Sequence, residues 1–145
     1  MKTKTIKLAV AFCIIALSLS CKDKNKVNPQ DAAKTMISKT WILDTGTAVT
    51  LGGEDITADY AGFEITFTNN GSYTTQSGTP AFHTSGTWNF VAESLIQIAR
   101  DSDITTDIVL TENSLLMTFT VSESQLGGRT TSLAGEYIFK LVKKN

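Results

Sequence analysis

The stretch Phe63-Glu-Ile-Thr-Phe-Thr-Asn-Asn-Gly-Ser-Tyr73 decides the fold class. Its first, third and fifth residues are aromatic or aliphatic and alternate with polar ones, a period of two that is typical of a strand with one buried face. Asn70-Gly71 then predicts a hairpin, because both residue types tolerate the positive φ that a tight primed turn needs. Alternation resumes at Tyr73 and Thr75, so two antiparallel strands are expected here.

The same alternation continues to the end of the chain. Turns rich in Asn, Asp, Gly and Ser separate most of the apolar runs, so consecutive strands are expected to be antiparallel neighbours. The eight expected strands cover about residues 40–50, 62–69, 71–77, 85–91, 94–100, 104–112, 114–122 and 134–143. Before them, Asn28 as an N-cap, Pro29 in the first turn and apolar residues at helical spacing predict a short helix over 29–38.

This pattern predicts an all-β domain with a short N-terminal helix. Eight sequential antiparallel strands can close as an up-and-down barrel or stack as a two-sheet sandwich. Short sequential hairpins favour the barrel, since a sandwich usually needs longer crossing connections. A closed barrel also leaves no strand edge exposed, which matters for segments rich in Thr and Ile.

Composition limits the classes of function. The chain has 145 residues, 41% of them hydrophobic, and a formal net charge of −1. That length predicts one ordinary domain with a packed core. The balanced charge offers no basic surface for nucleic acid.

Residues 1–20 have the pattern of a signal peptide. Three lysines form a basic n-region, and residues 8–19 form an apolar run that is too short to span a bilayer as a helix. Cys21 follows this run. It is the only cysteine of the chain that remains once Cys13 is removed with the signal, so an internal disulfide is not expected.

Leu17-Ser-Leu-Ser-Cys21 resembles the lipobox of bacterial lipoproteins. The resemblance implies that the Cys21 thiol is acylated and that the signal is cut before it, leaving 21–38 as a lipidated tether with a short helix and 39–145 as the barrel domain. Lys22 stands where an aspartate would retain an enteric lipoprotein at the inner membrane, so the resemblance implies the outer membrane, on either face. A cysteine close to an ordinary signal-peptidase site is the alternative.

Charge is segregated in the chain that would remain after cleavage. Residues 21–40 carry five lysines against two aspartates, and residues 41–145 carry five basic against 12 acidic residues. A basic tether could lie against anionic lipid headgroups while the acidic domain is held away from them. A tether that is merely solvated remains the alternative.

Several segments together are similar to small lipocalin-like lipoproteins of Gram-negative bacteria. They are Trp41 and residues 63–73, 85–90, 110–116 and 135–141. The resemblance implies a lipocalin-like barrel whose interior could bind a small hydrophobic ligand, and it implies no chemistry. The Gly-x-Trp motif of lipocalins is interrupted, because Lys39 stands two residues before Trp41.

No enzymatic activity, metal or cofactor is expected from the sequence. The single histidine, His83, has no Gly-x-Ser-x-Gly motif beside it. Asp101, Asp103 and Asp107 lack the glycine and the third oxygen ligand of a calcium loop, and turn chemistry explains Asp101-Ser-Asp103. Acidic residues at 54, 55 and 59 in the first long loop leave calcium conceivable there.

The candidate site is therefore the barrel interior. An eight-stranded barrel is just wide enough to be filled by side chains or to hold one small ligand, and both alternatives stay open. Tyr73, Trp88 and Tyr137 are the candidate ligand-lining residues that could orient a ligand with a polar group, and Phe63 and Phe119 join them. The residues expected to point inward are Trp41, Leu43, Phe63, Ile65, Phe67, Tyr73, Trp88, Phe90, Ile96, Ile98, Ile108, Leu110, Leu115, Met117, Phe119, Val121, Tyr137, Phe139 and Leu141.

A packed interior would move the function to the loops. Those at about 51–61, 77–85 and 123–133 are long enough to contact a protein or a glycan. The two expectations are thus a lipid-anchored carrier of a small apolar ligand and a non-enzymatic interaction lipoprotein.

Overall fold

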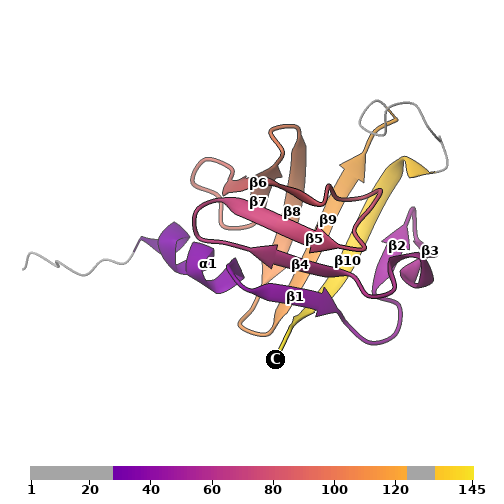
Figure 1. Ribbon diagram of the computed structural model, residues 1–145. Helices are drawn as coiled ribbons and strands as arrows, with labels where there is room; N and C mark the ends of the chain where they lie inside the picture. Colours follow the sequence, from indigo (N-terminus) through magenta and orange to yellow (C-terminus); the bar gives the residue numbers. More distant parts are fainter. Residues whose placement is uncertain (1–27, 124–132) are drawn as a thin grey trace, which may run out of the picture.

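The computed structural model describes residues 28–123 and 133–145. The predicted signal peptide, Cys21, the tether as far as residue 27 and most of the predicted 123–133 loop lie outside the described residues. The elements in chain order are α1 (Pro29–Ile37), β1 (Thr40–Leu43), β2 (Val49–Leu51), β3 (Glu54–Asp55), the 3-10 helix η1 (Thr57–Tyr60), β4 (Glu64–Phe67), β5 (Ser72–Gln76), β6 (Ser85–Phe90), β7 (Gln97–Arg100), β8 (Ile104–Leu110), β9 (Ser114–Val121) and β10 (Gly135–Lys143) (Figure 1).

Eight of these strands form a closed antiparallel barrel. The order is β1-β4-β5-β6-β7-β8-β9-β10, and β10 pairs back with β1. Trp41 marks the closure, because it lies opposite Ile65 of β4 on one side and Lys143 of β10 on the other. The prediction of an all-β, up-and-down, eight-stranded barrel with a short N-terminal helix is confirmed.

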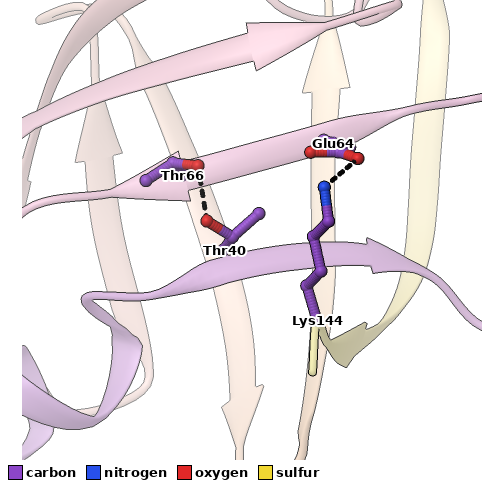
Figure 2. A network of polar contacts seen from close by, with 4 residues as sticks. All are labelled: Thr40, Glu64, Thr66 and Lys144. Carbon is purple, nitrogen blue, oxygen red and sulfur yellow. Dashed lines mark hydrogen bonds and ion pairs between the residues drawn. The ribbon is translucent and has the colours of Figure 1, made fainter.

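On the outer surface of the barrel, side-chain contacts also join the strands that flank β1. Lys144, just after β10, reaches over β1 to the carboxylate of Glu64 in β4, with 2.5 Å between Nζ and Oε1 (Figure 2). The hydroxyls of Thr40 and Thr66 are 2.8 Å apart beside this ion pair. An exposed ion pair contributes at most about 1 kcal/mol, so the backbone ladder supplies most of the stability of the closure.

The first predicted strand, 40–50, is divided into β1 and β2. Both pieces pair with β10, and the five residues 44–48 between them bulge out opposite the single residue Lys140. The backbone N–H of Lys140 donates to the carbonyl of Ala48 at 2.8 Å, and its carbonyl accepts from the N–H of Asp44 at 2.9 Å. The bulge therefore keeps the ladder intact. β3 and η1, which follow, were not expected from the sequence.

The predicted hairpin after Phe67 is present, with a different turn. Gly71 has φ +86°, and Asn70 is not among the described residues with positive φ. Thr68 N–H donates to the carbonyl of Ser72, which leaves a three-residue connection. Asn70 accepts hydrogen bonds through its side chain from Ser72 instead. A turn that ends on one glycine in the left-handed region is the common three-residue alternative to the primed turn.

Because neighbouring strands are antiparallel, their connections alternate between two ends of the barrel. We call the first the helix end; it holds α1, the turns after β4, β6 and β8, and the C-terminus. The second, which we call the loop end, holds residues 44–63, the connections after β5 and β7, and the start of β10. Figure 1 shows α1 at the left, and β2 with β3 at the right.

The helix end is closed by α1. The helix begins as predicted, with the Asn28 side chain accepting from the N–H of Gln30 and with Pro29 in the first turn. Ile37 is fully buried, and its carbonyl accepts a 2.8 Å hydrogen bond from Nε1 of Trp41. One indole thus joins the helix to the first strand and satisfies its own buried N–H.

Most of the predicted inward residues form the core, with one clear error. Ile96 is 67% exposed, because β7 begins at residue 97 and the predicted strand over 94–100 was too long. Leu43 and Leu110 are only partly buried. Buried residues that the prediction missed are Ile37, Ala48, Val49, Tyr60, Ala81, Phe82, Arg100, Ile104 and Thr106.

Candidate functional site

The five predicted ligand-lining residues all lie inside the barrel. Phe63, Tyr73, Trp88, Phe119 and Tyr137 are between 1% and 3% exposed or fully buried. Phe119 and Tyr137, on neighbouring strands, stack with ring centroids 5.6 Å apart and an interplanar angle of 12°. The strand alternation therefore placed these rings correctly.

The polar groups of the three predicted ligand-orienting residues already have partners in the protein. Trp88 Nε1 donates to the carbonyls of Thr68 and Ser72, at 3.2 and 3.0 Å. Tyr137 Oη donates to the carbonyl of Leu133 at 2.8 Å. Tyr73 Oη donates to the carboxylate of Asp101. These polar groups are bonded to the protein itself, so they are not available to orient a ligand.

Two aromatic side chains from connections fill the loop end. Tyr60 of η1 packs edge-on against Phe139, with ring centroids 5.0 Å apart. Phe82, in the connection between β5 and β6, lies 5.3 Å from the rings of Phe63 and Phe119 and 5.1 Å from Phe139. Phe82 thus touches rings from both sides of the barrel, and it enters from the connection between β5 and β6.

Arg100 is the charged residue of this interior. It ends β7, its side chain is fully buried, and its Nε donates to the hydroxyl of Thr106 at 3.2 Å. The guanidinium carbon lies 4.0 Å from the ring centroid of Phe82 and 4.3 Å from that of Phe119. Burial lowers the pKa of Arg100 to about 10, although the carboxylate of Asp101 opposes this effect. The group is still protonated at neutral pH.

The two terminal nitrogens of Arg100 make no hydrogen bond of good geometry with the described residues, although the hydroxyl of Tyr73 lies near them. The same holds for the hydroxyl of Tyr60, which lies near that of Tyr137. The adjacent carboxylate, Asp101, accepts from Tyr73 Oη and from the backbone N–H of Thr87. A Cβ at Gly86 would overlap that carboxylate, so only glycine leaves room for it there. The carboxylates of Asp101 and Asp103 favour the charged form of Arg100, but neither accepts a hydrogen bond of good geometry from its terminal nitrogens. Burying charged N–H groups without hydrogen bonds costs several kcal/mol, and such a group requires an explanation.

Sequence reasoning missed Arg100, although a signal for it was present. Two residues after Ile98 in a strand of period two, Arg100 must face the same side as Ile98, which is inward. Thr106 follows from the same argument, two residues before Ile108 in β8. Tyr60 and Phe82 carry no such signal, because residues of connections have no fixed period.

The other residues singled out from the sequence are placed as follows. His83 is exposed in the connection between β5 and β6. The carboxylate of Asp55 accepts hydrogen bonds from Thr57 and Thr47, and these bonds lower its pKa. In the described ranges, no three His, Cys, Asp or Glu side chains come close enough to hold a metal ion.

A second feature is an apolar groove on the outside of the helix end. Its volume is about 470 Å³, and it runs between α1, the residues just before β7 and the end of β8. The side chains along it are all apolar: Pro29, Ala32, Ala33, Met36, Leu95, Ile96, Ile108, Val109 and Leu110. Sequence reasoning placed Ile96, Ile108 and Leu110 in the barrel interior and did not anticipate this surface.

No helix within the described residues is long and apolar enough to cross a bilayer. No family model, curated protein or solved structure matches the chain.

Proposed function

We propose that this chain is a lipid-anchored, lipocalin-like protein of the cell envelope whose barrel binds a small apolar molecule bearing a carboxylate. The observation that carries the proposal is the buried guanidinium of Arg100, whose two terminal nitrogens make no hydrogen bond of good geometry with the described residues. The proposed role is binding without catalysis.

The chemistry of Arg100 favours a carboxylate. A guanidinium presents parallel N–H groups that match the two oxygens of a carboxylate, and such bidentate, charge-assisted pairs are among the strong hydrogen bonds of proteins. Nε is already bonded to Thr106, so the plane of the group is held in place. The phenyl rings of Phe82 and Phe119 on the guanidinium exclude water, which strengthens a bound ion pair.

The apolar part of the ligand would take the place of Phe82. That side chain comes from a connection at the loop end and is surrounded by the rings of Phe63, Tyr73, Phe119 and Phe139. A space left by one large apolar side chain, on the order of 150 Å³, can hold a molecule as large as benzene. Displacement of Phe82 would therefore open a small apolar pocket directly beside Arg100.

The proposed anchor determines how the barrel is oriented. Acylation of Cys21 would hold the tether in the membrane, by the resemblance to outer-membrane lipoproteins. The tether joins the helix end, at Asn28, so the loop end with Phe82 would face away from the bilayer. A ligand could then enter from the aqueous side.

Binding is tested by calorimetry with octanoate and, as its uncharged counterpart, octanol. We expect octanoate to bind at least about tenfold more tightly than octanol, because a charge-assisted pair contributes more than 1.4 kcal/mol. Arg100→Met should remove this preference. Lys140→Met removes the same charge from an exposed position of β10 and should preserve it. Equal affinities of the unaltered chain for the two ligands would contradict the proposal.

The anchor is tested separately, by mass spectrometry of the N-terminal peptide after expression in a Gram-negative host. We expect a peptide that begins at Cys21 and carries acyl chains. An unmodified Cys21, or cleavage elsewhere, would contradict the anchor and would leave the binding proposal untouched.

The second candidate function is an interaction protein that uses its loops. The observation that favours it is the filling of the loop end by Tyr60 and Phe82, which matches a packed barrel. It predicts that no apolar carboxylate binds, and that replacing the exposed residues Thr79, His83 and Thr84 of the connection between β5 and β6 with glycine abolishes capture of an envelope protein or glycan while the barrel stays folded. Retained capture by the folded replacement would contradict it.

A further inference from the structure

We infer that the helix end is a membrane-contact surface, in which the apolar groove beside α1 inserts into the headgroup region of a phospholipid bilayer. The inference rests on the proposed anchor for the orientation of the molecule. It goes beyond that proposal because it assigns a second contact with the membrane to the folded domain itself.

The exposed apolar side chains of the barrel are concentrated at this groove. In the described part of the chain, the large hydrophobic residues that count as exposed are Met36, Leu95, Ile96 and Val109, at 38%, 43%, 67% and 61%. All four line the groove, although they come from α1, from the approach to β7 and from β8. Single exposed apolar residues are ordinary, but a contiguous set marks an interaction surface.

The tether would hold this groove close to the membrane. Pro29 lines it, and Gln30 Nε2 donates to the carbonyls of Ala92 and Ser94 at 2.5 and 3.1 Å, which fixes the start of α1 against the approach to β7. Cys21 lies seven residues before Asn28. Seven residues span at most about 25 Å when fully extended, so an acylated Cys21 would keep the groove within that distance of the headgroups.

The charges also point the helix end toward an anionic surface. Four of the five lysines that the structure describes lie at this end: Lys34, Lys39, Lys143 and Lys144. The tether adds three more lysines, at 22, 24 and 26. Carboxylates are more numerous at the loop end, namely Asp44, Glu54, Asp55, Asp59, Asp101, Asp103, Glu123 and Glu136, whereas Asp31, Glu93 and Glu112 are those of the helix end. Anionic lipids attract such lysines and repel such carboxylates, so the barrel would stand with its helix end on the bilayer.

An apolar groove at the end of the domain that holds most of its lysines is the arrangement expected of an interfacial membrane-binding surface. The lining contains no charged side chain, so insertion would bury none.

The test uses residues 21–145 without acylation, mixed with vesicles of phosphatidylethanolamine and phosphatidylglycerol in equal parts. Sedimentation measures the fraction bound. We expect Ile96→Thr combined with Val109→Thr to weaken binding about tenfold, because both side chains lose their apolar contact while keeping a branched Cβ. The control, Ile42→Thr, changes a half-buried outward residue of β1 away from the groove and should leave binding unchanged. Thermal midpoints verify that all variants fold.

Several outcomes would overturn the inference. They are absence of vesicle binding by the unaltered chain, equal binding of the double variant, or a dimer in solution that the double variant abolishes while vesicle binding is absent. Because the vesicles receive unacylated protein, this result is independent of the anchor. Groove-dependent binding with an unmodified Cys21 in cells would refute only the anchor, and acylation with groove-independent binding would refute only the contact surface.

Discussion

Arg100→Met is expected to make the ligand-free barrel more stable. Methionine is unbranched and flexible, so it can follow the path of the arginine stem between Phe82 and Phe119. A pKa lowered from 12.5 to about 10 means that the fold disfavours the charged guanidinium by about 3 kcal/mol. Replacing buried charges with apolar groups of similar size is often neutral or stabilising by about 1–4 kcal/mol.

Contacts that Arg100→Met removes offset only part of this stabilisation. The hydroxyl of Thr106 loses the donor at 3.2 Å, which costs about 1 kcal/mol. The cation–ring contacts disappear, but sulfur–ring contacts of about 0.3–1.5 kcal/mol replace them. The expected net change is therefore a stabilisation of about 1–2 kcal/mol, or a rise of roughly 4–8 °C in the thermal midpoint for a domain of this size.

The assay is urea unfolding followed by circular dichroism, on protein that has been unfolded and refolded to remove any bound ligand, since a ligand would itself stabilise the native state. Arg100→Lys serves as the control. It keeps the buried charge but loses the fixed fork of donors, so we expect it to be less stable than the unaltered chain. If Arg100→Met destabilises the ligand-free barrel by more than about 1 kcal/mol, Arg100 is a structural residue and the reasoning is wrong.

Three further predictions concern the same interior. Phe82→Ala should cost about 3 kcal/mol of stability, and benzoate should restore more of that stability than benzamide, its uncharged counterpart. Equal rescue by the two ligands, or rescue by benzoate that persists when Arg100→Met is added, would contradict the carboxylate pocket. Tyr73→Phe should destabilise the barrel by about 1–3 kcal/mol, because it removes the donor to Asp101. Tyr60→Phe should destabilise it less, because the hydroxyl of Tyr60 makes no hydrogen bond of good geometry with the described residues. Urea unfolding of both variants compares them, and the reverse order would refute the hydrogen-bond assignment. Burial raises the pKa values of Tyr60, Tyr73 and Tyr137, so above about pH 10 these tyrosines ionise first in the unfolded chain, and the free energy of unfolding should fall with rising pH. The fall should be steeper in Arg100→Met, because that variant lacks the arginine whose proton the folded state releases first. Urea midpoints measure the profile, and a flat one between about pH 9 and 12 would contradict this prediction.

Strand alternation was enough to predict the barrel. The period of two in residues 63–73, 104–110 and 135–143 places alternate side chains in one core, and the short turns leave only sequential antiparallel pairing. The division of the first strand was not predictable in this way. The bulge over 44–48 depends on how β10 pairs with β1 and β2, and this pairing cannot be predicted from the local sequence.

The site was predicted less well than the fold. The aromatic residues were placed correctly, but the polar groups of Tyr73, Trp88 and Tyr137 turned out to bond the protein itself. Arg100 faces inward by the same alternation that places Ile98. Arginine is almost never fully buried without a partner, so its residue type led us to expect an exposed position. Phe82 enters the barrel from a connection, where only the tertiary fold decides the direction of a side chain.

Native mass spectrometry of the protein purified gently from a Gram-negative envelope tests the carboxylate proposal most directly. The unaltered chain should carry an added mass that disappears on denaturation and that fragments as a carboxylic acid. Arg100→Met should carry none, and Lys140→Met should carry the same mass as the unaltered chain. A clean polypeptide mass for the unaltered chain, or an added mass that Arg100→Met retains, would contradict a ligand held by Arg100.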